Sequence, residues 1–402
     1  MKTSMNELSG LAESLDIQVI DQFVQKADLP NGRTYIGSGK VEELKKAIQV
    51  LDIDIVIFND ELSPAQIRNL EKELSVQIMD RSFLILQIFS KRAQTKEAVL
   101  EVSLAQQRYM LPRLIGLSSS LSRQGGGSFN AKGAGETQLE LDRRKISTNI
   151  TQLERELEKI NREKDTARKR RQNNEIPVVS LVGYTNVGKS ATLNAILDYI
   201  LKVNDKNVIE KNMLFATLST FSRRIKPPKK PAFILTDTVG FVSRLPHDLV
   251  RSFESTLSEV KHADLILYVM DGSSSLAPLQ IETTTHVLKG LEADQVPHLY
   301  VLTHKDMMFT EHVSYHHDVA ISNKTFENLD VLIDMIYQKT YGKKIMVTLH
   351  IPFTDHGVLH QLENDTLILS KVYNDTGTQV LVELYEKQLP QFISYFKKEP
   401  IL

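Results

Sequence analysis

The chain of 402 residues contains no cysteine. It therefore has no disulfide framework and no thiolate chemistry, as is typical of a protein in a reducing compartment. No apolar run approaches the roughly 20 residues that a membrane-spanning helix needs, and the longest runs, such as Leu265–Val269, are strand-sized. The first residues also lack the apolar core of a secretory signal. We therefore expect a cytoplasmic protein without stable membrane insertion.

The chain has little net charge of either sign, because 49 basic and 50 acidic residues leave a formal charge of −1. Whole-chain charge therefore says nothing about nucleic acid, and charge has to be examined locally. The hydrophobic content of 41% and charged content of 25% are ordinary for a soluble globular protein. The length exceeds that of one typical hydrophobic core, so we expect two to four domains.

Four regions differ in their hydrophobic pattern. Residues 1–96 alternate strand-like and helix-like runs, which predicts a small N-terminal α/β domain with a parallel sheet. Residues 97–174 are helical except for a glycine-rich loop, residues 175–341 again alternate strands and helices, and residues 342–402 are rich in strands. The strand-like runs in the first region are Ile17–Ile20 and Ile53–Phe58, its helix-like runs are Lys40–Ile48 and Pro64–Leu70, and the last region contains the strand-like runs Ile345–Leu349 and Gln379–Leu384.

The second region is predicted to be a long antiparallel helical hairpin. Apolar residues on its second arm are spaced by four and three residues, which is typical of a coiled-coil seam. A matching stripe lies on the first arm, and the loop at 123–135 is too rich in glycine to be helical throughout. The seam residues are Ile146, Ile150, Leu153, Leu157 and Ile160, and the stripe consists of Leu100, Leu104, Gln107 and Leu111.

The segment Gly183-Tyr-Thr-Asn-Val-Gly-Lys-Ser190 matches the phosphate-binding pattern G-x-x-x-x-G-K-[ST]. It lies between a strand-like run, Val178–Val182, and a helix-like run, Ala191–Leu197. In such a loop the backbone N–H groups face the phosphates of a nucleotide, and the helix N-terminus adds its dipole. Lys189 would neutralise the β- and γ-phosphates and Ser190 would bind Mg²⁺. The motif predicts a nucleoside triphosphate site.

Later motifs favour guanine as the base. Asp237-Thr-Val-Gly240 ends a strand-like run, and in a D-x-x-G motif the aspartate reaches Mg²⁺ through water while the glycine N–H contacts the γ-phosphate. Thr217, between the two motifs, suits a second protein ligand of Mg²⁺. Asp306 follows another strand-like run, where N-K-x-D of GTPases places the carboxylate that accepts both guanine N–H groups. Ser322-Asn-Lys324 resembles the S-A-K loop at the guanine oxygen.

We therefore expect a P-loop GTPase domain with a mostly parallel sheet at residues 175–341. Its expected catalytic residues are Lys189, Thr217 and Gly240, and the expected metal ligands are Ser190 and Thr217. The expected nucleotide contacts are Gly183, Tyr184, Thr185, Asn186, Val187, Gly188, Lys189, Ser190, Phe215, Ala216, Thr217, Leu218, Ser219, Asp237, Thr238, Val239, Gly240, Thr303, His304, Lys305, Asp306, Ser322, Asn323 and Lys324.

Phe241 follows the D-x-x-G motif, where many small GTPases have the glutamine that orients the attacking water. A phenylalanine ring cannot orient water, so hydrolysis needs another group, a partner or a cation. The alternative, that Phe241 is a core aromatic residue, stays open. The histidines show no metal-ligand spacing and do not indicate a zinc site.

Over almost its whole length the chain resembles the HflX-type GTPases of the translation-factor-related class. The motifs at the hairpin tip and the Leu-Pro-His motif are particular to this family. The resemblance rests on Thr34–Leu44, Leu111–Leu114, Leu121–Gly127, Gly133–Glu140, Asp142–Arg144, Gly183–Ser190, Leu214–Leu218, Asp237–Val242 and Leu245–Val250.

The resemblance implies a GTPase that binds the large ribosomal subunit, splits or rescues stalled ribosomes, and hydrolyses GTP to GDP and phosphate. It also implies that the hairpin tip reaches ribosomal RNA near the peptidyl transferase region. Local charge agrees, because residues 113–135 contain no acidic side chain and basic residues cluster on the second arm. The residues expected at the RNA are Arg123, Gly125, Gly126, Gly127 and Lys132.

Asn186 resembles the potassium-binding asparagine of some cation-dependent GTPases, and K⁺ there would partly replace the missing glutamine. Because asparagine is also a common turn residue, both interpretations stay open. The expected cofactors are GTP or GDP and Mg²⁺, with K⁺ as an open possibility, and we expect a monomer.

Several positions depart from the family pattern. Thr303-His304 replaces Asn-Lys, and the stretch after Thr217 is Leu-Ser-Thr-Phe-Ser-Arg223. These departures favour a divergent paralogue and keep two alternatives open. One is a nucleotide-gated ribosome-binding protein with weak turnover that protects the peptidyl transferase region, and the other is an ATP-preferring enzyme. Whether residues 342–402, expected to form a small α+β domain, touch the ribosome or brace the GTPase domain also stays open.

Overall fold

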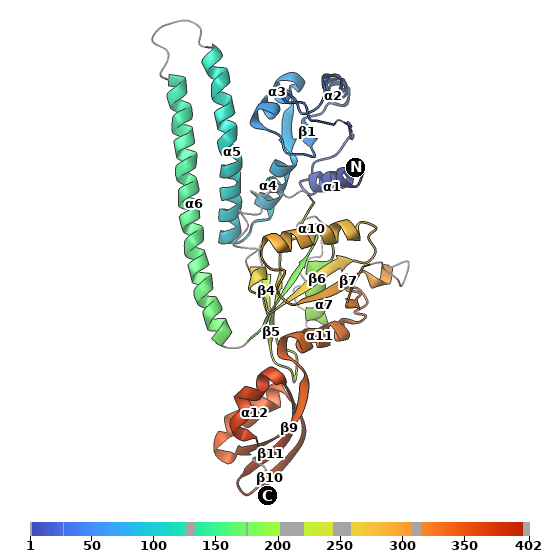
Figure 1. Cartoon of the computed structure of the whole chain (residues 1–402), viewed down its shortest axis with the longest axis vertical. Helices are drawn as coiled ribbons and strands as arrows, with labels where there is room; N and C mark the ends of the chain where they lie inside the picture. Colours follow the sequence, from blue (N-terminus) through green and yellow to red (C-terminus); the bar gives the residue numbers. More distant parts are fainter. Residues whose placement is uncertain are drawn as a thin grey trace. The chain divides into compact units, whose positions relative to one another are not determined.

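The computed structural model describes residues 2–26, 28–124, 134–173, 176–201, 221–243, 259–307 and 315–396 (Figure 1). The chain divides into two compact units. The first contains the described residues up to Ala167 together with Val242 and Ser243, and the second contains the remainder.

The N-terminal part of the first unit is an α/β arrangement around a two-stranded parallel sheet. β1 pairs with β2 from Ile55–Gln77 to Phe58–Asp80, which confirms the predicted parallel pairing. The predicted strand at Ile17–Ile20 is wrong, because these residues have no regular secondary structure and Ile20 is 50% exposed. The elements are α1 (Lys2–Glu13), α2 (Ser38–Leu51), β1 (Ile55–Phe58), α3 (Pro64–Leu74), β2 (Gln77–Asp80) and α4 (Arg81–Arg92).

A buried carboxylate at the end of β2 joins this part to the hairpin. Asp80 is fully buried, and its Oδ1 accepts hydrogen bonds from the Phe83 N–H at 2.8 Å and the Tyr109 hydroxyl at 2.9 Å. Its Oδ2 accepts from the Leu62 N–H at 3.2 Å and from Arg113 at 3.1 Å. Burial, and then the charge of Asp80, raises the pKa of Tyr109, which keeps the phenol protonated as a donor. All four donors therefore converge on one carboxylate.

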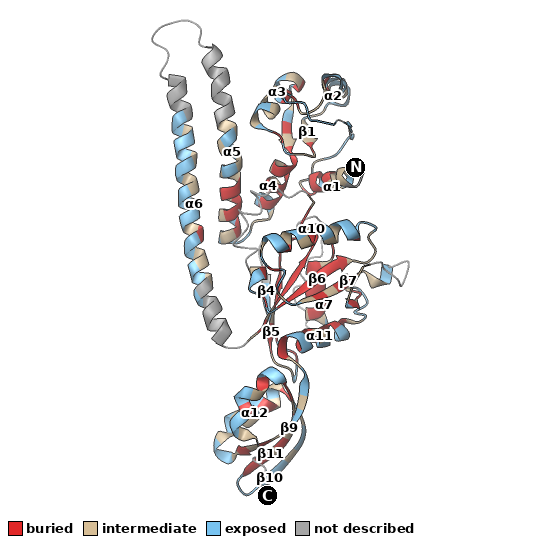
Figure 2. Cartoon of the chain, in the orientation of Figure 1, coloured by how far each residue is buried: buried red, intermediate tan, exposed pale blue. Residues whose placement is uncertain are grey.

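The hairpin consists of α5 (Lys96–Gln124) and α6 (Ala134–Asn173). Lys164 pairs with Glu97 at 2.7 Å and Arg108 pairs with Glu154 at 2.8 Å, so sequence positions rise along one helix as they fall along the other. This confirms the predicted antiparallel pairing, and Figure 2 shows the coloured part of α6 largely exposed. The five predicted seam residues lie on the less exposed side of α6, because Leu157 is buried and the other four are half-buried. The predicted glycine-rich tip at 125–133 lies outside the described residues.

The second unit is built on a six-stranded sheet in the order β4-β5-β3-β6-β7-β8. All neighbouring strands are parallel except the edge strand β4, which runs antiparallel to β5. The central strands are continuous apolar runs because helices cover both faces of such a sheet, and Figure 2 shows β6 and β7 largely buried. The strands are β3 (Val178–Gly183), β4 (Phe221–Ile225), β5 (Phe233–Asp237), β6 (Leu265–Asp271), β7 (His298–Thr303) and β8 (Val319–Ala320), and the helices are α7 (Lys189–Leu201), α10 (Ala277–Gly290) and α11 (Leu329–Tyr341), with the short 3₁₀ helix η1 (Lys305–Met307).

The last region forms a three-stranded antiparallel sheet in the order β10-β11-β9, with an apolar core that includes Leu349, Leu362 and Val382. Two helical elements pack on this core, an α-helix through Leu362 and a 3₁₀ helix through Phe392, as an α+β arrangement requires. The multidomain α/β architecture is confirmed, whereas the division into four domains at residues 96, 174 and 341 stays a prediction. The elements are β9 (Lys344–Pro352), η2 (Phe353–Asp355), α12 (His356–Asp365), β10 (Leu367–Asn374), β11 (Gly377–Tyr385) and η3 (Glu386–Tyr395).

Three tyrosines join this sheet to α11. Tyr385 stacks on Tyr337 with ring centroids 5.4 Å apart, and both rings contact Tyr341 at 5.9 Å. The hydroxyl groups of Tyr337 and Tyr341 donate to the carbonyls of Pro231 and Ala232. Tyr337 and Tyr341 therefore bury the apolar area of their rings while their hydroxyl groups keep hydrogen-bond partners.

None of the helices described combines the length and the apolar character that crossing a membrane requires.

Candidate functional site

The phosphate-binding motif follows β3 and continues into α7. The Thr185 N–H donates to the Phe241 carbonyl at 2.7 Å, and the Phe241 N–H donates to the Gly183 carbonyl at 3.2 Å. The loop and the segment after β5 are therefore held together by backbone bonds. Two residues of the loop have a left-handed backbone, Asn186 with φ 62° and Gly188 with φ 90°. Asn186 is exposed, and asparagine tolerates this conformation better than most residues do. The conformation therefore fits the interpretation of Asn186 as a turn residue.

Lys189 lies under this loop and is only 6% exposed. Its Nζ donates to the carbonyl of Tyr184 at 2.7 Å and to that of Gly183 at 3.2 Å. Burial lowers the pKa of Lys189 to about 8, although the nearby charge of Asp237 opposes the shift. A Cβ on Gly240 would lie 2.9 Å from this Nζ and 2.7 Å from the Thr185 Cα, so only glycine fits at the D-x-x-G position.

The lowered pKa of Lys189 makes nucleotide affinity depend on pH. A bound polyphosphate favours the ammonium form, so binding above about pH 8 requires uptake of the proton that the free protein has lost. We expect the Kd for GTP to rise by up to about tenfold per pH unit above pH 8 and to be flat below it. Fluorescence titration with a labelled GTP analogue between about pH 7 and pH 9 measures this slope.

The control for this titration is Lys189→Arg, because a guanidinium does not lose its proton in this range. A variant that still binds should show a flat profile. An equal slope in both proteins would assign the titration to another group.

Two side chains with oxygen atoms of the kind that Mg²⁺ prefers lie near the lysine. The Ser190 hydroxyl donates to Asp237 Oδ2 at 2.6 Å, and Asp237 is 3% exposed. Mg²⁺ takes one or two protein oxygen ligands and keeps waters or phosphate oxygens in its other positions, so this pair suits it. Within the part of the chain that the structure covers, no cluster of three or more histidine and acidic side chains forms a metal site. The predicted residues Phe215, Ala216, Thr217, Leu218 and Ser219 lie outside the described residues.

The residues after β5 are buried rather than open to solvent. Thr238 is fully buried and its hydroxyl donates to the Leu181 carbonyl at 2.6 Å, and Val239 is 7% exposed. Phe241 is 2% exposed. Its ring therefore belongs to the core, which supports the alternative that it is a packing residue, and it offers no polar group to an attacking water.

The chain that leaves Gly240 is fixed again three residues later. The Ser243 N–H donates to Glu7 Oε1 at 3.2 Å, and Arg81 donates to the Ser243 carbonyl at 3.0 Å. Arg81 is 2% exposed and also pairs with Glu7 at 2.9 Å. Residues from α1 and α4 thus hold the segment that follows D-x-x-G.

The base-side residues lie at the carboxyl ends of β7 and β8, next to the phosphate-binding loop. Asp306 is exposed on η1, and its Oδ1 accepts a hydrogen bond from the buried Ser322 hydroxyl at 2.8 Å. Lys305 points to Glu327, with the two charged atoms 2.6 Å apart. The two predicted base loops are therefore brought together, with the Asp306 carboxylate at the surface.

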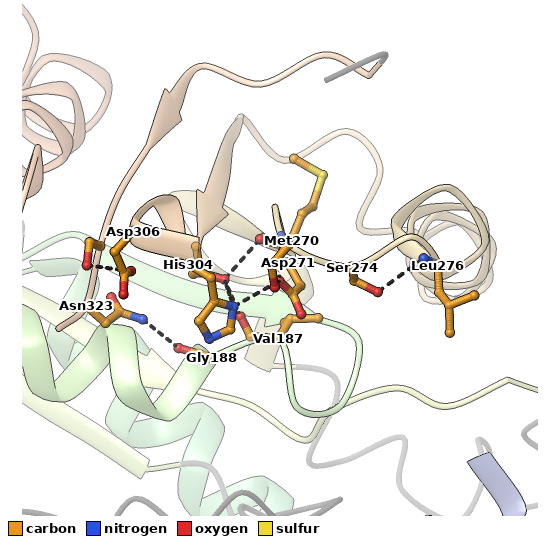
Figure 3. Close-up of polar contacts among 12 residues, drawn as sticks. Val187, Gly188, Met270, Asp271, Ser274, Leu276, His304, Asp306 and Asn323 are labelled. Atoms are coloured by element: carbon orange, nitrogen blue, oxygen red, sulfur yellow. Dashed lines mark hydrogen bonds and ion pairs between the residues drawn. The ribbon is translucent and has the colours of Figure 1, made fainter. Parts of the chain in front are cut away.

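His304 has a partner that the sequence did not suggest (Figure 3). Its backbone is left-handed, with φ 57°, and its Nδ1 lies 2.9 Å from Asp271 Oδ1. Burial alone would raise the pKa of Asp271, but hydrogen bonds from His304 and Ser273 outweigh it, so the pKa lies below its ordinary value. The available signal was the position of Asp271 at the carboxyl end of a buried strand, where ligands of parallel sheets bind.

Of the residues predicted to contact RNA, Arg123 lies within α5. Gly125, Gly126, Gly127 and Lys132 lie outside the described residues. On the second arm, Arg162 pairs with Glu158 and Lys164 pairs with Glu97, so these two basic side chains are locally neutralised.

Three family models match successive parts of the chain. "GTP-binding GTPase N-terminal" matches residues 2–90, "GTP-binding GTPase Middle Region" matches residues 92–171, and "50S ribosome-binding GTPase" matches residues 178–304. The first two ranges contain the N-terminal part and the hairpin, and the third contains the phosphate-binding loop.

Curated relatives match over most of their length. GTPase HflX of Caldanaerobacter subterraneus is 41% identical, covering 95% of this chain and 87% of that protein. GTPase HflX of Escherichia coli is 34% identical, covering 87% of this chain and 82% of that protein. A solved GTP-binding protein of Sulfolobus solfataricus in complex with GDP is 24% identical with a TM-score of 0.45, covering 84% of this chain and 96% of that one.

Proposed function

Because this chain belongs to the family of HflX GTPases, we propose that its GTP hydrolysis is controlled by the large ribosomal subunit and serves to split or rescue stalled ribosomes. The observation that carries the proposal is the match of residues 178–304 to the 50S ribosome-binding GTPases. The long helical hairpin of α5 and α6 supports it, since such an arm suits insertion into a large RNA assembly. We also propose that the protein is a monomer and acts in the cytoplasm.

The nucleotide site is assigned as follows. Lys189 and the loop N–H groups bind the phosphates, Gly240 contacts the γ-phosphate, and Asp306 accepts the guanine N–H groups. Mg²⁺ would be held by Ser190, with Asp237 acting through water and Thr217 as a second ligand. The ion would neutralise charge on the transferring phosphoryl group. Support comes from the short Ser190–Asp237 contact and the buried Lys189.

Hydrolysis also needs a group that positions or polarises the attacking water, because Phe241 is buried and apolar. We propose that a ribosomal group or a K⁺ ion at Asn186 supplies it. The exposed left-handed backbone of Asn186 leaves its side chain open to solvent, where a cation can reach it.

The RNA contact is assigned to the hairpin tip, at Arg123, Gly125, Gly126, Gly127 and Lys132. Because Arg162 and Lys164 on the second arm already pair with acidic residues, they are weaker candidates for phosphate contacts.

The first test is the rate of GTP hydrolysis as the concentration of purified large subunits increases, in potassium buffer. We expect a saturable rise of about tenfold or more, which corresponds to about 1.4 kcal/mol off the barrier. Sodium buffer is the control for the K⁺ assignment. Ribosome splitting is then followed by light scattering of intact ribosomes with GTP and with GDP.

The second candidate is a nucleotide-gated binder with weak turnover, and the buried Phe241 favours it. A hydrolysis rate that stays near zero although the protein cosediments with subunits only when GTP is bound would establish it. Protection of peptidyl transferase activity from an inhibitor would then be the readout.

The assignment of guanine to Asp306 gives a separate prediction. Asp306→Ala should weaken GTP binding by about 100-fold and leave ATP binding unchanged, because a base N–H pair is left without acceptors. Asp306→Asn should favour xanthosine triphosphate over GTP, since the new amide donates to the xanthine carbonyl. Binding is measured by calorimetry, with the exposed Asp294→Ala as the control. Unchanged GTP affinity in Asp306→Ala would support the ATP-preferring alternative.

A further inference from the structure

Two side chains reach from the base loops to the phosphate-binding loop. Thr303, at the end of β7, is fully buried, and its Oγ1 lies 2.7 Å from the Val187 carbonyl and 3.1 Å from that of Met270. Asn323, beyond β8, directs its Nδ2 to Thr192 Oγ1 at 3.1 Å and toward the Gly188 carbonyl at 3.5 Å. Figure 3 shows the Asn323 side chain directed toward Gly188, with Asp306 and His304 nearby.

Both side chains also pack on the loop at one point. A Cβ placed on Gly188 would lie 3.3 Å from Asn323 Nδ2 and 3.6 Å from both Thr303 Cγ2 and Thr303 Oγ1. The φ of Gly188 is 90°, a conformation that glycine adopts at low cost. The middle of the phosphate-binding loop therefore contacts one residue from each base loop, Thr303 after β7 and Asn323 after β8.

The donor chemistry explains why two residues are used. The N-K-x-D pattern of GTPases has asparagine at position 303, and an amide carries two N–H donors. A threonine hydroxyl has a single proton, so it can serve either the Val187 or the Met270 carbonyl at one time. The amide of Asn323 supplies donors at Gly188 and Thr192 that the hydroxyl of Thr303 lacks.

We propose that Thr303 and Asn323 form a two-residue clamp that positions the phosphate-binding loop in place of a single asparagine at 303. Both are positioning residues, because they act on Val187 and Gly188 rather than on the nucleotide. The clamp links the loops at the base to the loop at the phosphates, and a base-contacting segment therefore fixes phosphate geometry. The proposal rests on the assignment of these loops to GTP, and it does not depend on the ribosome.

The test is a rescue experiment on the full chain without ribosomes. Asn323→Ala should raise the Kd for GDP and for GTP by about tenfold, since one amide–carbonyl and one amide–hydroxyl contact are lost. Thr303→Asn alone should change affinity by less than about threefold, and Thr303→Asn with Asn323→Ala should restore it to within about threefold. The ratio of GTP to ATP affinity should stay constant in all three variants, because none of them touches Asp306.

Asn328→Gly is the matched control, because the Asn328 amide donates to the Ala320 carbonyl at 2.8 Å, away from the phosphate-binding loop, and its φ of 60° suits glycine. This variant should bind GDP and GTP as the unaltered protein does, both alone and combined with Thr303→Asn. If Asn323→Ala does not fold, Asn323→Ser replaces it, since serine retains one shorter donor and should lose less affinity.

Three outcomes would overturn the clamp. These are unchanged affinity in Asn323→Ala, an affinity of the double variant that is no better than that of Asn323→Ala, and a shift in the ratio of GTP to ATP affinity. Failure of the guanine assignment gives a different result. In that case Asp306→Ala would keep the GTP to ATP ratio while the rescue still occurred. The two proposals are thus separated by one set of titrations.

Discussion

Lys189→Ala is expected to weaken GTP binding by at least about 100-fold, or about 2.7 kcal/mol, because it removes a buried cation from the phosphates. The Lys189 side chain is 6% exposed and donates hydrogen bonds to two loop carbonyls. A cation at the protein surface therefore cannot take the place of its charge. GDP should lose less than GTP, since the γ-phosphate charge is absent. Calorimetric titration with both nucleotides measures the two losses.

The control for this variant is Lys261→Ala, an exposed lysine that pairs with Glu292 away from the site. It should bind both nucleotides as the unaltered protein does. If Lys189→Ala kept GTP affinity within about threefold, the phosphate assignment of the loop would be wrong, since each charge-assisted contact is expected to contribute more than that.

Asp80→Ala is expected to lower the free energy of unfolding of the first unit by about 3–5 kcal/mol, because it breaks the ion pair with the half-buried Arg113 and leaves that guanidinium with only the carbonyl acceptors of Tyr109 and Leu62. The same change removes the N-terminal cap of α4 and the partner of the Tyr109 hydroxyl. Hydrogen exchange should show faster opening of the α5 amides near Tyr109 than of the amides in β3. The chain has no tryptophan, so urea unfolding is followed by far-ultraviolet circular dichroism.

The matched control is Asp16→Asn, which removes the charge of a carboxylate that pairs with Lys91 and is 78% exposed, and keeps a residue that tolerates the left-handed φ of 64°. Exposed pairs contribute about 0–1 kcal/mol, so this variant should unfold near the unaltered protein. Equal destabilisation by the two variants would show that the buried network contributes no more than a surface pair.

Local sequence patterns predicted the strand and the helix that flank the phosphate-binding motif. The strand and helix around Gly183–Ser190 follow from a continuous apolar run and a motif, and the structure has both. Ile17–Ile20 has the composition of a strand but no regular structure, because a strand also needs a partner edge and this cannot be seen in a short run. The edge strand β4 was missed for the related reason that its antiparallel pairing with β5 depends on the intervening chain.

The polar network around Asp80 and the contacts of Thr303 and Asn323 were not predictable from spacing. Asp80 and Arg113 lie 33 positions apart, and Asn323 and Gly188 lie 135 apart, so only the folded backbone brings them together. The motifs predicted which loops would surround a nucleotide. They did not reveal which side chains hold those loops to one another, because the hydrogen-bonded residues are far apart in the sequence.

The tyrosine stack determines how the last region can be studied by deletion. A protein shortened after Tyr341 would lose Tyr385 and uncover the faces of Tyr337 and Tyr341, together with Lys226, whose partner Asp365 lies in α12. The new surface would be aromatic and contiguous, which favours self-association. A shortened protein that failed on ribosomes would therefore report poor solubility as readily as a lost contact. Substitutions of the exposed β10 residues Val372 and Tyr373 leave the stack intact and are the cleaner probe of that region.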